Sequence, residues 1–303
     1  MTFTVWNVGP SCDSISPPKP SLLRHKQDIP YTRSERDYGI RLAADIAADG
    51  KRPPIPEAWN PALSYLMASC WSDNAGLRLS LGQVMTSLSM IITAGGDMVT
   101  ASALPAKAET KEKSSNPDLP PGEPWRRVEI KDMSKVKKGE VLGSGSFSTV
   151  YKSSFRNEPA AIKLFRNSEE DKAFREIETS FALRHPNIIG LFAWFQVRGA
   201  LTQIGMIIEF AGGGDLQRLY KGDTFSFKIG LKIVLGAAKG LAHMHSMPTP
   251  VVHRDIKSGN VMVMSDGVTG KLGDCGESRR VDLNNTMTQT GSPLWAAVSV
   301  GSV

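Results

Sequence analysis

The feature that most constrains this chain is a polar segment, His-Arg-Asp-Ile-Lys-Ser-Gly-Asn, at residues 253–260. A short turn, Asp-Cys-Gly, follows at residues 274–276. Together the two segments supply two carboxylates, an amide and a lysine, which are groups that a phosphoryl-transfer site uses. Each residue alone is also common in ordinary turns, so the prediction depends on their order and on the motifs upstream.

Four side chains of these segments have distinct chemical uses. Asp255 can orient a hydroxyl group and take its proton during attack. Lys257 can neutralise charge on a phosphoryl group in transfer. Asn260 and Asp274 offer oxygen ligands of the kind that Mg²⁺ prefers. The set predicts phosphoryl transfer assisted by a magnesium ion.

A glycine-rich loop, Leu-Gly-Ser-Gly-Ser-Phe-Ser-Thr-Val at residues 142–150, lies upstream. Gly143 and Gly145 allow the backbone to turn tightly and to approach phosphate oxygens closely. The β-prone residues 149–152 exclude a dinucleotide-binding fingerprint, which needs a helix there, and no Gly-Lys-Ser/Thr closes a Walker A loop. A simple hairpin turn is the alternative interpretation.

A lysine lies within a predicted apolar strand at Ala160–Leu164, and a charged amphipathic helix is predicted at Glu169–Leu183. Lys163 on such a strand must reach water or meet an anion, and Glu176 of the helix can be that anion. The alternative is two solvated charges. The predicted buried stripe of the helix comprises Phe174, Ile177 and Phe181.

These motifs, in this order, resemble those of eukaryotic protein kinases over residues 125–297. Residues 207–211, Ile-Ile-Glu-Phe-Ala, resemble the hinge between lobes, and residues 290–297 resemble the end of an activation segment. Lys257 is typical of Ser/Thr kinases. The stretches at residues 184–188, 212–216 and 292–295 are similar to the tyrosine-kinase-like group.

The resemblance implies transfer of the γ-phosphate of ATP, with Mg²⁺, to Ser or Thr hydroxyls of a protein substrate. It implies a catalytic set of Asp255, Lys257, Lys163 and Glu176, and metal ligands Asn260 and Asp274. It also implies a nucleotide enclosed by Leu142, Gly143, Ser144, Gly145, Val150 and Ala161, with phosphates on Lys163 and adenine on backbone groups of Glu209 and Ala211.

The predicted fold is α+β and bilobal: an antiparallel-sheet N-lobe over residues 125–211 and an incomplete helical C-lobe over residues 212–303. Strands are predicted at 140–142, 149–152, 160–164, 188–196 and 206–210, and a long helix at Phe227–His245. Residues 1–27 are expected to be irregular, and the polar, proline-rich residues 95–124 are expected to form a disordered linker.

Three more helices are predicted before the linker, at Tyr38–Ala48, Asn60–Trp71 and Ser80–Ile91, with Ser80 as an N-cap. Pro-Tyr at residues 30–31, Arg-Pro-Pro-Ile-Pro at 52–56 and Cys-Trp at 70–71 resemble the last third of a kinase domain. Residues 28–94 are therefore expected to be the C-lobe remnant of one kinase domain that precedes a second. In principle these helices could instead fold back as a permuted tail.

Two departures from the family pattern predict a weakened active state. Cys275 stands where the metal-binding turn usually has Phe, and Ser180 stands where a large apolar residue would stack against that Phe. The chain also ends soon after residues 296–297, so the supporting C-lobe helix is expected to be missing. The alternatives are an ATP-binding regulatory pseudokinase, or a fragment or incorrect gene model of a tandem kinase.

Composition narrows the remaining possibilities. The net charge of +6 fits an anionic ligand such as a nucleotide, but it is too weak and scattered to predict nucleic-acid binding. The three cysteines have no metal-ligand spacing and favour a reducing, cytoplasmic environment. The N-terminus lacks a signal-peptide pattern, and no apolar run is long enough for a membrane span.

Overall fold

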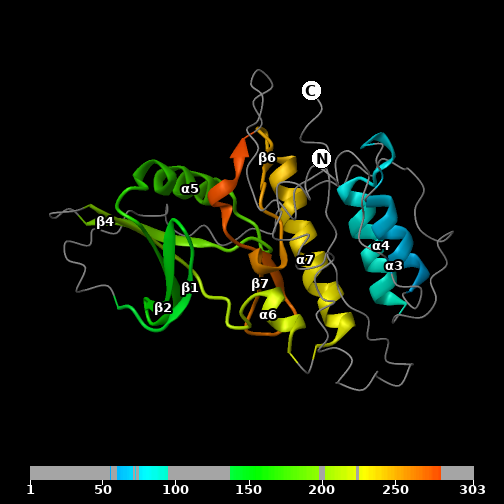
Figure 1. Cartoon of the computed structure of the whole chain (residues 1–303), viewed down its shortest axis with the longest axis horizontal. Coiled ribbons are helices and arrows are strands. Elements are labelled where there is room, and N and C mark those ends of the chain that lie inside the picture. Colours follow the sequence, from blue (N-terminus) through cyan, green and yellow to red (C-terminus); the bar gives the residue numbers. More distant parts are fainter. Residues whose placement is uncertain are drawn as a thin grey trace, which may run out of the picture.

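A computed structural model describes residues 55, 60–70, 72, 75–94, 137–197, 202–222 and 225–280. Its N-lobe is a five-stranded sheet in the order β1-β2-β3-β5-β4, and every neighbouring pair is antiparallel (Figure 1). The strands are β1 (Val141–Ser144), β2 (Ser148–Phe155), β3 (Glu158–Phe165), β4 (Leu191–Val197) and β5 (Gln203–Glu209). The five predicted strands are confirmed, with ends shifted by a few residues.

The β2–β3 hairpin follows from its turn. Arg156 and Asn157 both have positive φ angles, 52° and 68°, as a tight two-residue hairpin requires. Strand β3 is buried from Ala160 to Phe165, so Lys163 is carried into the interior by its apolar neighbours.

Helix α5 (Glu170–Ala182) packs on β4 and β5 through an apolar cluster. Ile177 is 6% exposed, and the ring of Phe174 meets Trp194 edge-on with centroids 5.8 Å apart. The prediction that Phe181 is buried is wrong: it is 42% exposed and lies beside the guanidinium of Arg184. The buried positions of α5 end at Ile177, so its last turn contributes little to the core.

Helix α7 (Phe227–Ser246) is the centre of the C-lobe and confirms the predicted long helix. It lies against β8 (Gly270–Leu272), which pairs with β7 (Val261–Val263). Gly236 permits this close approach, because a Cβ there would lie 2.5 Å from the backbone oxygen of Gly270. The remaining C-lobe elements are α6 (Leu216–Tyr220), β6 (Val251–Val252), η4 (Ser258–Asn260), η5 (Cys275–Glu277) and β9 (Arg279–Arg280).

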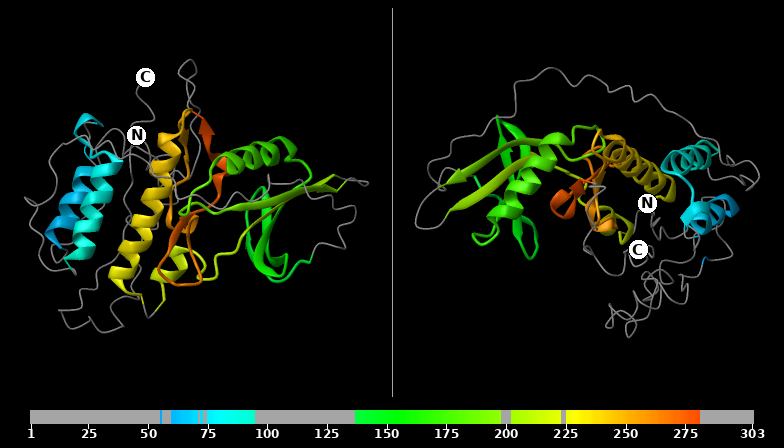
Figure 2. Two further views of the ribbon diagram at one scale, coloured as in Figure 1. Left: turned by 180° about the vertical axis from the view of Figure 1, so that it is seen from behind. Right: turned by 90° about the horizontal axis from the view of Figure 1, so that it is seen from above.

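Two helices from the N-terminal part of the chain pack beside α7, on the side away from the sheet (Figures 1 and 2). They are α3 (Pro61–Cys70) and α4 (Leu81–Thr93), with the short 3-10 helix η1 (Ala75–Leu77) between them. Their apolar residues, including Leu66 and Leu88, belong to the same hydrophobic cluster as Leu231 and Leu241 of α7. In the described chain the two helices thus share the C-lobe core.

The predicted N-cap of α4 is confirmed as a capping box. The hydroxyl of Ser80 accepts a hydrogen bond from the backbone N–H of Gln83, and the Gln83 side chain accepts one from the Ser80 N–H. The predicted helix at residues 38–48, the proposed linker and residues 281–303 lie outside the described part. Within that part, no helix is long and apolar enough to cross a membrane.

Candidate nucleotide and phosphoryl-transfer site

The site is organised around the buried ammonium group of Lys163. Its Nζ lies 2.5 Å from Oε1 of Glu176 on α5 and 2.8 Å from Oδ1 of Asp274. The side chains of Lys163 and Glu176 are 10% and 7% exposed, whereas Asp274 is 53% exposed. The structure therefore brings together three predicted residues from a strand, a helix and the Asp-Cys-Gly turn.

The charges of this cluster depend on one another. Burial alone would lower the pKa of Lys163, but the carboxylates of Glu176 and Asp274 outweigh it and raise that pKa above its usual value. The Lys163 ammonium in turn lowers the pKa of Asp274. Burial raises the pKa of Glu176, and Lys163 opposes that rise. Lys163 thus stays charged in the interior because two carboxylates surround it.

The Asp-Cys-Gly turn lies directly beneath α5. Asp274 has a positive φ of 53°, and a Cβ added at Gly276 would lie 3.0 Å from Oε2 of Glu176. Cys275 is 6% exposed, and burial raises the pKa of its thiol to about 12. The thiol is therefore protonated and poorly nucleophilic.

The segment at residues 253–260 holds its carboxylate in a defined position. Oδ2 of Asp255 accepts hydrogen bonds from Nζ of Lys257 at 2.7 Å and from Nδ2 of Asn260 at 2.8 Å. Nε2 of His253, which is fully buried, donates to the backbone oxygen of Gly273 at 3.1 Å. That bond connects the segment to the residue before Asp274, so the two predicted segments meet in space.

The glycine-rich loop closes β1 onto β2 and is held from β3. Arg166 donates through Nη2 to the backbone oxygen of Gly145 at 3.1 Å, and its N–H donates to that of Phe147 at 2.9 Å. Neither Gly143 nor Gly145 has a positive φ, and a Cβ on Gly143 would meet nothing within 4 Å. The backbone turn does not require these glycines, so what they provide is open space beside the loop.

The predicted nucleotide-enclosing residues lie on the strands around Lys163. Val150 of β2 is paired with Lys163, and Ala161, 4% exposed, is paired with Ile208 of β5. Leu142 and Ser144 lie on β1, where the Ser144 hydroxyl is 3.2 Å from that of Thr149. Glu209 ends β5, and the backbone oxygen of Ala211 accepts from the N–H of Gly214 at 3.1 Å.

An ion pair that the sequence did not reveal fixes the side chain of Glu209. Nζ of Lys271 on β8 lies 2.6 Å and 2.8 Å from its two carboxylate oxygens, and Gly190 N–H donates to Oε2 at 3.2 Å. This pair connects the predicted hinge to the strand that leads into Asp274. A lysine three residues before that Asp was the only available signal, and its partner is remote in sequence.

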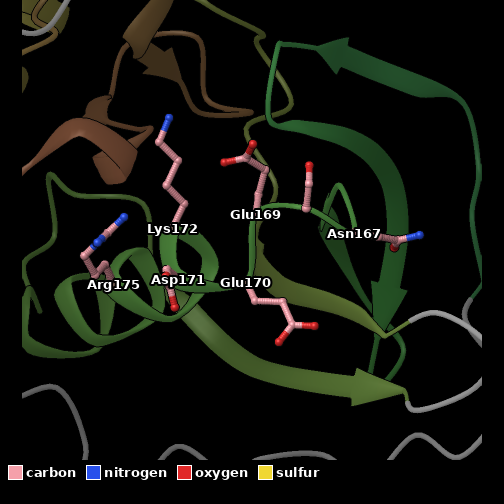
Figure 3. Close-up of a pocket in the computed structure, with 7 residues that line it drawn as sticks. Asn167, Glu169, Glu170, Asp171, Lys172 and Arg175 are labelled. Atoms are coloured by element: carbon pink, nitrogen blue, oxygen red, sulfur yellow. The ribbon is translucent and has the colours of Figure 1, made fainter.

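A hollow of about 330 Å³ lies at the N-terminal end of α5, lined by residues 167–172 and Arg175 (Figure 3). None of its lining residues belongs to the Lys163 cluster or to the segment at residues 253–260. It is a polar surface feature, separate from the residues predicted to bind the nucleotide.

The predicted magnesium ligands fit an ion shared with phosphate. Within the described ranges no three His, Cys, Asp or Glu side chains form a preformed metal site. Mg²⁺ usually takes one or two protein oxygens and completes its shell with phosphate and water. Asn260 and Asp274 match that donor set, and their segments are joined by the Gly273 N–H bond to the Asn260 backbone oxygen.

Comparison with known proteins gives the family of this chain. Residues 136–300 match the protein kinase domain, and the chain belongs to the protein kinase family. It is 31% identical over 183 residues to Serine/threonine-protein kinase TNNI3K of Mus musculus, an alignment that covers 55% of the chain and 21% of that protein.

Other relatives carry the same type of name. The chain is 31% identical over 175 residues to a Putative serine/threonine-protein kinase/receptor R826 of Acanthamoeba polyphaga mimivirus, covering 55% of the chain and 10% of that protein. It is 30% identical over 176 residues to human Mitogen-activated protein kinase kinase kinase 7, covering 56% and 28%. The chain thus spans less than a third of the length of each relative.

Proposed function

We propose that this chain transfers the γ-phosphate of ATP to Ser or Thr hydroxyls of a protein, as a kinase of the tyrosine-kinase-like group. The observation that carries the proposal is the Lys163 ammonium, buried and held by Glu176 and Asp274. A cation so placed can hold nucleotide phosphates and is already positioned before they bind. The Ser/Thr names of the relatives and the presence of Lys257 support the choice of hydroxyl.

The remaining residues take roles that fit their positions. Asp255 orients the attacking hydroxyl and accepts its proton, while Lys257, already hydrogen-bonded to Asp255, neutralises charge on the transferred group. Asn260 and Asp274 would hold Mg²⁺, which when bound neutralises charge on the phosphate oxygens. Backbone groups of Glu209 and Ala211 would contact adenine.

The enclosure of the nucleotide would come from the N-lobe sheet. Its members in this proposal are Leu142, Gly143, Ser144, Gly145, Val150 and Ala161. Free cysteines at positions 70 and 275 fit a reducing, intracellular site of action, where ATP and a protein substrate would also be present. The proposed docking end of the activation segment, residues 290–297, lies outside the described residues.

A second candidate function is an ATP-binding regulatory module with little or no phosphate transfer. The observation that favours it is the small size of Cys275 and Ser180, which leaves little apolar packing between the metal-binding turn and α5. Loss of large apolar groups from a core typically costs about 2–4 kcal/mol.

Two measurements on the full chain distinguish these functions. They are phosphate transfer to myelin basic protein and stabilisation of the fold by MgATP. The unmutated chain is compared with Lys163→Met, which removes the phosphate-holding cation, and Asp255→Asn, which removes the base. Transfer lost in both variants supports the kinase. No transfer in any of the three, with the unmutated chain still stabilised by MgATP, supports the regulatory module. No stabilisation by MgATP contradicts both.

We also propose that α3 and α4 are kinase-type C-lobe helices that here complete the core of the kinase domain itself. Support comes from the shared cluster of Leu88 with Leu231 and Leu241 of α7. In the tandem interpretation, by contrast, residues 28–94 would form a separate remnant, joined to the second domain by the linker at 95–124.

The two domain arrangements differ in what α4 does for α7. Leu88 is 1% exposed, so Leu88→Asp in the full chain should speed amide hydrogen exchange in α7 by tenfold or more, because an uncompensated buried charge costs several kcal/mol. Thr86→Asp, at an exposed position of the same helix, is the matched control. Unchanged exchange in α7 would contradict the proposal.

A further inference from the structure

Lys172 lies between the glycine-rich loop and the Asp-Cys-Gly turn. Its Nζ is 2.9 Å from the centroid of the Phe147 ring, at the tip of the loop, and 3.6 Å from Oε1 of Glu277 at the end of η5. Figure 3 shows this side chain rising from the first turn of α5, away from the helix axis. Lys172 precedes Glu176 by four residues and therefore shares its helix face.

The contacts of Lys172 continue to the catalytic segment. The backbone oxygen of Glu277 accepts a hydrogen bond from Nε of Arg254 at 2.6 Å, and Arg254 immediately precedes Asp255. A line of contacts therefore runs from Phe147 through Lys172 and Glu277 to the residue beside the proposed base. Of the four elements it joins, α5 is the one that also supplies Glu176 to Lys163.

Among the described residues, the buried apolar side chains of α5 and of the turn beneath it belong to different hydrophobic clusters. Cys275 belongs to the hydrophobic cluster of the C-lobe, whereas Ala173 and Ile177 of α5 belong to a separate cluster with β4 and β5. In the described chain an ion pair joins Lys172 of α5 to Glu277, and Glu176 of α5 is connected to Asp274 through the ammonium group of Lys163 on β3. We therefore expect these ion pairs to contribute to holding α5 over the turn.

We propose that Lys172 is a positioning residue that holds the glycine-rich loop, α5 and the metal-binding turn in the nucleotide-binding arrangement. This inference rests on the proposed function, because the arrangement it stabilises is the one that places Lys163 and Asp274 for nucleotide phosphates. The ammonium acts on Phe147 as a cation over an aromatic face and on Glu277 as an ion-pair partner. Lys172 itself does not touch the nucleotide in this scheme.

The physical nature of the contacts sets the expected effect. The side chains of Lys172 and Glu277 are 25% and 27% exposed, so their ion pair is only partly screened by solvent and is not deeply buried. A cation–aromatic contact and a half-buried ion pair together correspond to about a three- to tenfold change in affinity. Both weaken as salt is added, because mobile ions screen partly exposed charges.

The test measures the dissociation constant of MgADP for the full chain by calorimetry, in low and high salt. Lys172→Met keeps the aliphatic stem and removes the charge, and Glu277→Gln removes the partner charge. Each should weaken MgADP binding about three- to tenfold in low salt, and the double variant should be no weaker than the worse single variant. Lys172→Arg, which keeps the charge and the aromatic contact, should restore most of the affinity.

Arg175→Met is the matched control, because it removes a positive charge from an exposed position of the same helix. Equal dissociation constants for Lys172→Met, Arg175→Met and the unmutated chain overturn the inference and leave the proposed function standing. An unmutated chain that binds no MgADP refutes the proposed function, and the inference with it. Additive effects of Lys172→Met and Glu277→Gln would show that the two residues do not act as a pair.

Discussion

Removal of one partner from the buried Lys163–Glu176 pair should destabilise the N-lobe strongly. The perturbation is Glu176→Ala, which leaves the ammonium of Lys163 buried with only Asp274 within ion-pair distance in the described chain. A buried charge that loses its partner typically costs about 3–5 kcal/mol. Because Asp274 remains 2.8 Å away, we expect a value near the lower end, about 3 kcal/mol.

The matched control is Glu178→Ala, the same substitution at an exposed position two residues further along α5. Exposed substitutions away from specific contacts usually change stability by less than about 0.5 kcal/mol. Urea unfolding of the full chain in the absence of nucleotide, followed by tryptophan fluorescence, measures both. Trp194 is a suitable reporter because its ring packs against Phe174 of α5.

A third variant tests whether the cost comes from the charge rather than from lost volume. Lys163→Met combined with Glu176→Leu removes both charges and fills the space with apolar groups, so most of the stability should return. The reasoning is refuted if Glu176→Ala and Glu178→Ala are equally destabilising, or if the double variant is no more stable than Glu176→Ala.

Three smaller predictions follow from single contacts. Ser80→Ala removes the capping box of α4 and should cost about 1 kcal/mol in urea unfolding followed by circular dichroism; an unchanged midpoint contradicts it. Gly240→Ala places a Cβ against the backbone oxygen of Asn187 and should cost about 1–3 kcal/mol, whereas a neutral effect would show that α7 can shift. Burial, with His243 and nearby lysines, lowers the pKa of His185 to about 4. Below about pH 6.5 the His185 side chain of the unfolded chain binds a proton, whereas that of the folded chain stays neutral down to about pH 4. The free energy of unfolding should therefore decrease as the pH falls from about 6.5 toward 4. His185→Gln should flatten the pH dependence of the unfolding free energy, and an unchanged slope would contradict this assignment.

The fold was readable from the sequence where local pattern and burial agree. Apolar periodicity located α5 and α7 because each buries one face, and Ser80, predicted as an N-cap, marked the start of α4. The same reasoning failed at Phe181, which lies on the predicted stripe but beyond the part of α5 that reaches the sheet. Helical periodicity predicts which face of a helix is buried. It does not predict how far along the helix the packing against the sheet extends.

The residues of the candidate site were likewise predicted in part and missed in part. The sequence predicted four site residues because each lies in a short motif whose chemistry suits phosphoryl transfer: Lys163, Glu176, Asp255 and Asp274. Lys172 and the Lys271–Glu209 pair were missed because isolated lysines are usually solvated, and their partners lie in other motifs. Only the positions of those partners in space distinguish such a lysine from a surface charge.

The sequence by itself determined the family and the order of strands and helices in the N-lobe, and it predicted which side chains suit phosphoryl transfer. These properties depend on motifs and periodicities within a few turns of chain. The tertiary structure decided that α3 and α4 share the core of α7, that Lys172 of α5 pairs with Glu277 at the end of the Asp-Cys-Gly turn, and that Lys163 is held by two carboxylates. Each of these depends on contacts between segments far apart in the chain, where burial sets both the strength of an ion pair and the cost of leaving it unpaired.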